Sequence, residues 1–374
     1  MREVRLKDVA ALAGVSTATV SRVLHGNGYV SAHARGHVEE ALRESGYRLN
    51  AVAQELRRQK TVTIGLILHG ELSHPFVGEI VIGAEQAAAE HGFNVLLFNA
   101  HGNADREREC VETLLKRRVD GIIFTTAMQG DNVLLAVDAG VRAVEIGRRL
   151  CDTASAVVVG NHAAAMEAVR HLLSLGHRKI GFLGEPFPHG SDQAANIPGA
   201  DIPRERFDAY RDALEACGLA VDSAHIVLGR YPREQGGWGG LEAGAAYMRR
   251  LLSQAPDLTA VFAVSDLVAA GAMQALYAKG IRVPEQLSVV GFDDTFARYL
   301  APPLTTVRQP MFDMGYKAVS LAIKLMAEDA PGSSVEFCQT RLIIRETTAP
   351  APVAGNSIPG RMMLWTGNRL KLGG

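Results

Sequence analysis

The start of the chain decides the fold, because Val4–Leu24 reads VRLKDVAALAGVSTATVSRVL. Gly14 separates two stretches that carry apolar residues at helical spacing, and glycine readily adopts the left-handed backbone that ends a helix. We therefore predict one helix over Leu6–Ala13. A second helix is predicted over Thr17–Leu24, with Ser16 as its N-cap, because a serine hydroxyl can accept from the unpaired N–H groups of the first turn.

A third helix is predicted from Ser31, another good N-cap, to about Ser45. Two helices joined by a tight glycine turn and supported by a third form a helix-turn-helix domain, although a generic small helical bundle would show the same pattern. Residues 1–60 hold ten Lys/Arg and six Asp/Glu, giving +4, whereas residues 61–374 hold 29 and 34, giving −5. This basic head favours a nucleic-acid partner, and a solvated basic face is the plainer alternative.

The chain has 374 residues, of which 47% are hydrophobic and 21% charged, a composition typical of a globular protein of two or three domains. No run of about 18 apolar residues occurs, so no membrane-spanning helix is expected. The first residues lack the long apolar stretch of a secretory signal, which favours a cytoplasmic protein. The cysteines form no C-x-x-C pair, so we expect reduced, structural thiols and no metal or other cofactor. They are Cys110, Cys151, Cys217 and Cys338.

After residue 60 the pattern changes to short apolar runs that alternate with helical stretches. Such alternation predicts parallel sheets covered by helices on both faces. The predicted strands are Val62–Leu68, Val95–Asn99, Gly121–Thr125, Ala143–Ile146, Lys179–Leu183, Ile226–Leu228, Ala260–Val264 and Ser288–Phe292. Four strand–helix units precede Asn161 and four follow it, so we predict two similar α/β lobes with a ligand site between them.

The last stretch, residues 349–374, begins with a Pro- and Ala-rich segment that is typical of an exit from a folded domain. We expect a flexible tail there. A partner-binding helix over 361–374 is the alternative, because that segment mixes apolar and basic residues.

Ordered motifs along nearly the whole chain resemble the LacI/GalR family of bacterial transcriptional regulators. They cover about residues 3–348. Beside Val4–Leu24 they are Gly28–Ser31, Gly46–Arg48, Asn50–Ala53, Ile64–Ile67, Ser73–Phe76, Val119–Ile123, Leu175–Ile180, Val289–Asp294 and Pro303–Pro310. Four positions depart from the family pattern: Leu49, where proline is common, Gly160, where aspartate is common, and Ser265 and His74, where asparagine is common.

The resemblance implies a fold class and a domain order. An all-α helix-turn-helix head over 1–48 and a hinge helix over 49–60 precede a body over 61–348 that resembles periplasmic sugar-binding proteins. Its two doubly wound parallel-sheet lobes are assigned as 61–161 plus 293–322, and 162–292 plus 323–348. The implied protein is a homodimer that binds operator DNA and has a small sugar-like effector in the body.

The family positions that contact DNA fall on polar and small residues of the head and hinge. Arg22 is expected to read a base, because an arginine can donate two hydrogen bonds to guanine, although it could instead pair with a carboxylate. Leu56 matches the leucine that kinks the minor groove, and packing on the body is its alternative. The full set is Ser16, Thr17, Ala18, Thr19, Ser21, Arg22, His25, Ser31, Tyr47, Asn50, Ala53 and Leu56.

The family positions that contact the effector suggest a sugar site made of aromatic faces and planar polar groups. They are Phe76, Arg206, Trp238, Ser265, Asp293 and Gln309. The two aromatic residues could instead belong to the core, and Arg206 with Asp293 could be a structural ion pair. Asp266 and Asp294 are expected to cap the helices that follow them rather than to contact a ligand.

No catalytic pattern is found: neither a phosphate-binding loop, nor a G-x-S-x-G elbow, nor an ordered nucleophile–base set. His33 and His37 lie four residues apart, but two ligands alone make a poor metal site. We therefore expect a DNA-binding transcriptional regulator, a repressor, and not an enzyme. A transport-type solute-binding protein and a sugar-modifying α/β enzyme are the alternatives.

Overall fold

The computed structural model describes residues 4–25, 27–47, 61–70, 72–186, 201–230, 239–328 and 332–352. The chain divides into two compact units, Met1–Thr61 and Val62–Gly374. Within the described ranges, no helix has both the length and the apolar character that a membrane crossing requires.

The head is the three-helix domain predicted from the sequence. Its helices are α1 (Leu6–Ala13), α2 (Thr17–His25) and α3 (Ala32–Ser45). Val9, Val20 and Val38, one from each helix, are fully buried and form the centre of its core. Gly14 ends α1 with a φ of 65°, the left-handed conformation in which glycine carries no steric penalty. The tight turn between α1 and α2 therefore follows directly from the sequence.

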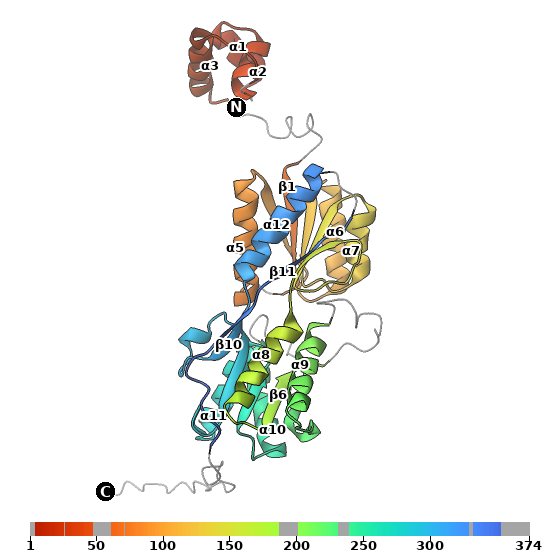
Figure 1. Ribbon diagram of the computed structural model, residues 1–374. Coiled ribbons are helices and arrows are strands. Elements are labelled where there is room, and N and C mark those ends of the chain that lie inside the picture. The colour runs from red at the N-terminus through yellow and green to blue at the C-terminus, as the bar shows by residue number, and fades with distance from the viewer. Residues whose placement is uncertain are drawn as a thin grey trace, which may run out of the picture. The chain divides into compact units, whose positions relative to one another are not determined.

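The first lobe of the body is a six-stranded parallel sheet in the order β11-β5-β4-β3-β1-β2. Helices α5 and α12 cover one face, and α6 and α7 cover the other (Figure 1). The strands are β1 (Thr63–Leu68), β2 (Asn94–Asn99), β3 (Gly121–Thr125), β4 (Arg142–Ile146), β5 (Ser155–Val159) and β11 (Val335–Cys338). The helices are α5 (Pro75–Glu90), α6 (Ala104–Lys116), α7 (Gly130–Asp138) and α12 (Met311–Glu328).

The second lobe repeats this plan with the order β12-β10-β9-β8-β6-β7, in which only the edge strand β12 is antiparallel. Helix α8 packs with α9, and α10 with α11. The strands are β6 (Ile180–Gly184), β7 (Ile226–Leu228), β8 (Ala260–Ala263), β9 (Ser288–Asp293), β10 (Thr305–Arg308) and β12 (Arg341–Ile343). The helices are α8 (Asn161–Ser174), α9 (Ile202–Ala216), α10 (Gly239–Gln254) and α11 (Asp266–Ala278).

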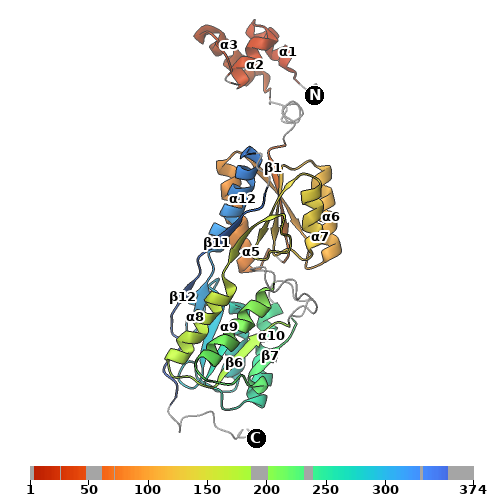
Figure 2. The same cartoon turned by 45° about the vertical axis from the view of Figure 1, so that its right-hand side comes forward.

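The chain passes between the lobes three times, and two passages lie elsewhere than the sequence suggested (Figure 2). The first passage joins β5 to α8, the second joins β10 to α12, and the third joins β11 to β12. The assignment of 293–322 to the first lobe and 323–348 to the second was wrong in detail. Strand β10 pairs with β9 and keeps 305–308 in the second sheet, whereas α12 continues past residue 322 in the first lobe.

Candidate functional site

The N-terminus of α2 is fixed by Ser16, as the sequence predicted. The Ser16 hydroxyl accepts from the Thr19 backbone N–H at 3.1 Å and lies 2.9 Å from the Thr19 hydroxyl. An N-cap of this kind satisfies a backbone donor that the helix itself leaves unpaired. Both side chains therefore have local structural roles, and their contact with DNA remains a prediction.

The outer face of α2 presents the residues expected to reach DNA bases. Thr17, Ala18 and Arg22 are exposed, whereas Thr19 and Ser21 are half-buried. Gly28, with a φ of 80°, lies against Arg22: a Cβ atom built there would be 3.7 Å from Arg22 Cδ. The loop after α2 therefore packs beside the arginine and leaves it on the exposed surface of the helix.

Tyr29 follows Gly28 and is 90% exposed, a large value for an aromatic side chain. Tyr29 was not among the residues predicted to contact DNA. The available signal was a tyrosine directly after Gly28, the glycine at which an added Cβ atom would meet the Arg22 side chain.

Ser31 caps α3, since its hydroxyl accepts from the Ala34 backbone N–H at 3.3 Å. The side chain of Tyr47 is half-buried and packs against the core of the head, so its hydrocarbon part has a structural role. The side chain of His25, and Asn50, Ala53, Leu56 and the other residues of the predicted hinge, lie outside the described residues.

In the body, Arg206 of α9 is buried at the carboxyl edge of the second sheet. Its Nε and one terminal nitrogen donate to Asn161 Oδ1 at 3.1 and 3.0 Å, and the other terminal nitrogen donates to the Val264 carbonyl at 2.6 Å. The guanidinium also lies 3.7 Å from the centroid of the Phe292 ring, a cation–π contact. The arginine is therefore held by α8, by the residue that follows β8 and by β9 together.

Asp293 and Gln309, both predicted effector residues, are joined directly. Gln309 Nε2 donates to Asp293 Oδ1 at 2.7 Å, and both side chains are buried. Burial raises the pKa of Asp293 to about 6, against the opposing effects of the Arg206 charge and the Gln309 hydrogen bond. Asp293 also has a φ of 118°, which is strained for any residue other than glycine.

Asp266, expected to be a helix cap, has another role. Ser265 is the N-cap of α11, because its hydroxyl accepts from the Val268 N–H at 3.3 Å. Asp266 instead accepts from the Thr306 hydroxyl at 2.6 Å and from the Thr295 N–H at 2.9 Å. Burial and the nearby Asp293 charge raise the pKa of Asp266 well above its usual range.

Asp294 was also expected to be a cap, and this too was wrong. Its carboxylate is paired with Arg308 and Arg345, which come from other parts of the second lobe. Asn161 was likewise not among the predicted site residues, although it holds Arg206. The partners of Asp266, Asp294 and Asn161 are distant in sequence, and so no local motif could indicate them.

The first lobe contributes Phe76 in the first turn of α5, after β1. Phe76 is half-buried, packs against the core of that lobe, and meets the His74 ring edge-on at a centroid distance of 6.4 Å. His74 caps the helix through Nδ1, which accepts from the Phe76 N–H at 3.2 Å. Burial lowers the pKa of His74 to about 4, so the ring is neutral at pH 7. Trp238 lies outside the described residues.

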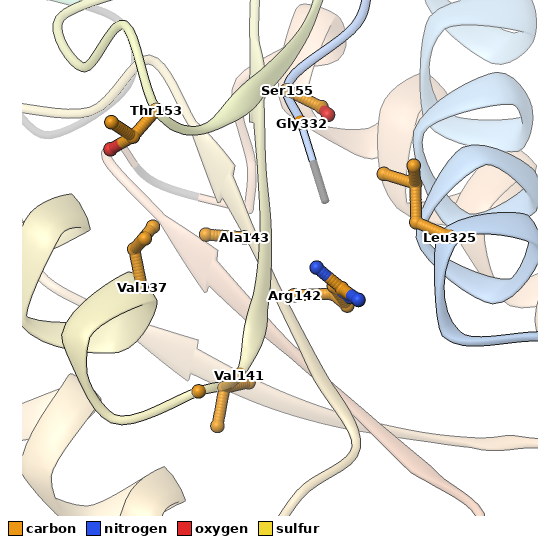
Figure 3. Close-up of a pocket in the computed structure, with 9 residues that line it drawn as sticks. Val137, Val141, Arg142, Ala143, Thr153, Ser155, Leu325 and Gly332 are labelled. Atoms are coloured by element: carbon orange, nitrogen blue, oxygen red, sulfur yellow. The ribbon is translucent and has the colours of Figure 1, made fainter. Parts of the chain in front are cut away.

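A cavity of about 80 Å³ lies at the amino edge of the first sheet, where β4 and β5 begin (Figure 3). Arg142, Ser155 and Leu325 are among its lining residues, and none of the predicted effector residues is. The His33 and His37 rings lie 4.3 Å apart on α3, and in the described ranges no third histidine, cysteine or carboxylate completes a metal site.

A helix-turn-helix head in one chain with a two-lobed α/β body that holds a buried polar cluster defines the class of ligand-responsive DNA-binding regulators. Residues 5–50 match the model of bacterial regulatory proteins of the lacI family, and residues 169–348 match a periplasmic binding protein-like domain. The chain belongs to the lacI family of bacterial regulatory proteins.

One similar protein and two similar solved structures illustrate the relationship. The HTH-type transcriptional regulator CelR of Thermobifida fusca is 34% identical, over 92% of this chain and 98% of the relative. The structure of a CelR–cellobiose complex is 32% identical, with a TM-score of 0.66 over 92% of this chain and 99% of that one. The lac repressor dimer bound to operator and the anti-inducer ONPF is 27% identical, with a TM-score of 0.78 over 93% and 100%. These proteins are regulators and not enzymes.

Proposed function

We propose that this protein is a cytoplasmic transcriptional repressor, a homodimer whose affinity for operator DNA is controlled by a small sugar-like effector. The observation that carries the proposal is the presence, in one chain, of an exposed recognition face on α2 and the buried Arg206, Asp293 and Gln309 cluster at the carboxyl edge of a doubly wound sheet. Ligands of such sheets bind at that edge.

The cluster favours an uncharged, hydroxyl-rich ligand. Gln309 donates to Asp293, which orients its amide so that the oxygen can accept from a ligand hydroxyl. Asp293 adds a carboxylate, and burial of both groups excludes water that would compete with the ligand. Cellobiose is the first compound to test, because the similar CelR structure is a complex with it.

Arg22 is proposed to read a guanine, with Thr17 and Ala18 making short contacts beside it, because all three are exposed on α2. Arg22→Ala should remove about 1–3 kcal/mol of discrimination at one base pair in each half-site. A binding-selection assay measures this directly. An unaltered sequence preference would reject the base-reading role, and Arg35→Ala, at an exposed arginine of α3 outside the predicted DNA contacts, is the control.

The proposed hinge over 49–60, with Asn50, Ala53 and the minor-groove residue Leu56, rests on the family match. A helix of ten residues or so is marginal in water, so it is expected to form only on DNA beside a second hinge. Leu56→Ala should weaken specific operator binding far more than binding to random DNA. An equal loss on both DNAs would mean that Leu56 does not insert.

The decisive experiment for the proposal is a gel shift with genomic fragments, with and without cellobiose, together with thermal melting in the same sugar. A regulator shows a sugar-dependent shift of a specific fragment. Sugar stabilisation without any DNA binding would instead identify a transport-type solute-binding protein. Turnover of the sugar would identify an enzyme.

A further inference from the structure

Asp294 sits one residue beyond the proposed effector contact Asp293, and its carboxylate is held by two arginines. Arg308 Nε lies 2.6 Å from Asp294 Oδ2, and a terminal nitrogen of Arg345 lies 2.6 Å from Asp294 Oδ1. Only 3% of the Asp294 side chain is exposed, against 14% for Arg345 and 53% for Arg308. We call Asp294, Arg308 and Arg345 the carboxylate clamp.

The clamp joins three segments that meet near the passages between the lobes. Asp294 follows β9, Arg308 is the last residue of β10, and Arg345 follows β12. Arg308 immediately precedes Gln309 and the passage into α12. On the neighbouring strand it faces Arg341, the first residue after the third passage. The second passage therefore leaves the second lobe beside the point where the third passage enters it.

Arg345 fixes its own segment firmly. Its other terminal nitrogen donates to the Leu304 carbonyl at 2.7 Å, and its backbone N–H donates to the Thr305 hydroxyl at 2.9 Å. Because β10 begins at Thr305, Arg345 binds both ends of the connection from β9 to β10. We therefore expect a movement of Asp294 to shift the segments of β10 and β12 as well, and not only the loop between β9 and β10.

The turn that carries Asp293 and Asp294 is strained, with φ values of 118° and 58° at two consecutive non-glycine residues. Such conformations persist only where surrounding contacts hold them, and they are frequent at ligand sites and switch regions. Here the holding contacts are the Gln309 side chain and backbone N–H on Asp293, at 2.7 and 3.2 Å, and the two arginines on Asp294. The effector contact and the clamp therefore share one turn.

We propose that Asp294 is the positioning residue through which effector occupancy at Asp293 acts on the second and third passages between the lobes. The inference rests on the proposed function. A ligand changes an equilibrium only by binding two states unequally, so contacts at Asp293 matter for DNA only if the passages move with them. The clamp supplies that connection. Without the clamp, Asp293 and Gln309 still bind the ligand, but the second and third passages no longer move when it binds.

The test compares the full-length wild-type protein with Asp294→Asn, using cellobiose as the probe. Operator Kd is measured with and without cellobiose, and cellobiose Kd with and without operator. Coupling factors in allosteric proteins are about 5- to 150-fold and are reciprocal, so both ratios should fall together to about 1 in the variant. The Kd of the free protein for cellobiose should change far less than either ratio. A coupling factor equal to that of the wild type would overturn the proposal.

Two further variants keep this test interpretable. Arg308→Gln removes the exposed arm and leaves the Asp294–Arg345 pair, so it should fold even where Asp294→Asn does not, and it should reduce the coupling factor to a smaller extent. Asp257→Asn is the matched control, because Asp257 pairs with Lys179 in the same lobe but before β8, at the amino edge of the sheet. It should leave the coupling unchanged.

If cellobiose does not bind the wild-type protein, that result counts against the disaccharide in the proposed function and not against the clamp. Hydrogen exchange without ligand then decides. In Asp294→Asn, or in Arg308→Gln if the first variant does not fold, the Gln309 and Arg345 amides should exchange at least several-fold faster, with β6 and β8 unchanged. Unchanged exchange at both amides would overturn the proposal.

Discussion

The two lobes share one topology but use their buried carboxylates differently. In the first lobe, Glu107 and Glu145 are almost fully buried, and each is satisfied by neighbouring donors. Glu145 accepts from the Leu150 and Cys151 N–H groups at 2.9 and 3.1 Å. Glu107 accepts from backbone N–H groups that precede α7 and from the Asn132 amide. These acids hold loops in place.

In the second lobe, Asp266 and Asp293 are buried acids, and the buried Arg206 of α9 acts on Asp293 through its charge. Asp293 sits on a strained turn at the edge of the sheet where ligands of this fold bind. Burial alone therefore does not distinguish the proposed effector site from the first lobe. What distinguishes it is a buried acid with a charged neighbour held in place and a strained backbone.

The largest effect is expected for Arg206→Ala. Removal of the guanidinium leaves Asp293 without its buried positive neighbour and leaves Asn161 and Val264 without their donor. We expect the free energy of unfolding to fall by about 3–5 kcal/mol and effector binding to be lost. The loss of unfolding free energy should be smaller at pH 5 than at pH 8, because a protonated, neutral Asp293 is no longer stabilised by the positive charge of Arg206.

Arg211→Ala is the matched control for this variant, because Arg211 lies on the same helix and pairs with Asp208 and Asp212 at the surface. Exposed pairs contribute about 0–1 kcal/mol. Denaturant titration at both pH values compares the two variants. Equal losses in Arg206→Ala and Arg211→Ala would show that the second lobe holds no special charge arrangement.

The next effect is a pH dependence in the first lobe. Burial raises the pKa of Glu145 from 4.5 to about 7, with hydrogen bonds from Leu150 and Cys151 opposing the shift. The folded protein therefore binds this proton more tightly than the unfolded chain does. The contribution of Glu145 to stability is complete below about pH 4.5 and is lost as the pH rises through about 7, on the order of 3 kcal/mol at most.

Glu145→Gln should remove this slope. The variant should also be less stable than the wild type at low pH, because an amide nitrogen cannot accept from the second backbone N–H, and this difference should shrink as the pH rises. His74, whose pKa is lowered to about 4, gives the opposite slope over an overlapping range, so the measured quantity is the difference between the variant and wild-type profiles. Glu85→Gln, an exposed position on α5, is the control. Parallel wild-type and Glu145→Gln profiles would contradict the assignment.

A third effect tests what the lobes share. In each lobe one helix pair packs through glycine: a Cβ atom at Gly83 of α5 would lie 2.0 Å from the Phe312 carbonyl oxygen, and one at Gly271 of α11 would lie 1.9 Å from that of Leu241. Gly83→Ala should cost about 1–3 kcal/mol by overpacking. Gly78 lies on the same helix, but a Cβ atom there would be 3.9 Å from its nearest neighbour, the Leu72 carbonyl oxygen. Gly78→Ala should therefore be neutral or slightly stabilising. Thermal melting separates the two, and similar melting temperatures would refute close packing.

Much of this fold was predictable from the sequence, because it rests on local patterns. The head helices and eight of the strands follow from periodicity, glycine and capping residues. Strand β5 was missed because it follows β4 without a helix between them, which interrupts the alternation. Strand β10 was missed because it is only four residues long, and β11 and β12 were missed because they are short, partly exposed edge strands.

The candidate site was predictable only in part. Arg206, Asp293 and Gln309 were predicted from family positions, and the structure joins Gln309 to Asp293 and brings the charge of Arg206 near Asp293. The roles of Asn161 and Asp266 were not found, because their partners lie elsewhere in the chain. Spacing along a sequence describes one helix or strand. It carries no information on which side chains from separate strands meet at the edge of a sheet.

The smallest effect separates a cap from a ligand contact. Ser265 was predicted as an effector residue, and the structure gives its hydroxyl a place at the N-terminus of α11. Ser265→Ala should cost about 1 kcal/mol of stability, as should Asn103→Ala, which removes the corresponding cap of α6 in the first lobe. If Ser265 is only a cap, both variants keep wild-type affinity for the effector in calorimetry. A loss of affinity in Ser265→Ala alone would make Ser265, which follows β8, a contact of the proposed effector. The caps of the two lobes would then differ in function as well.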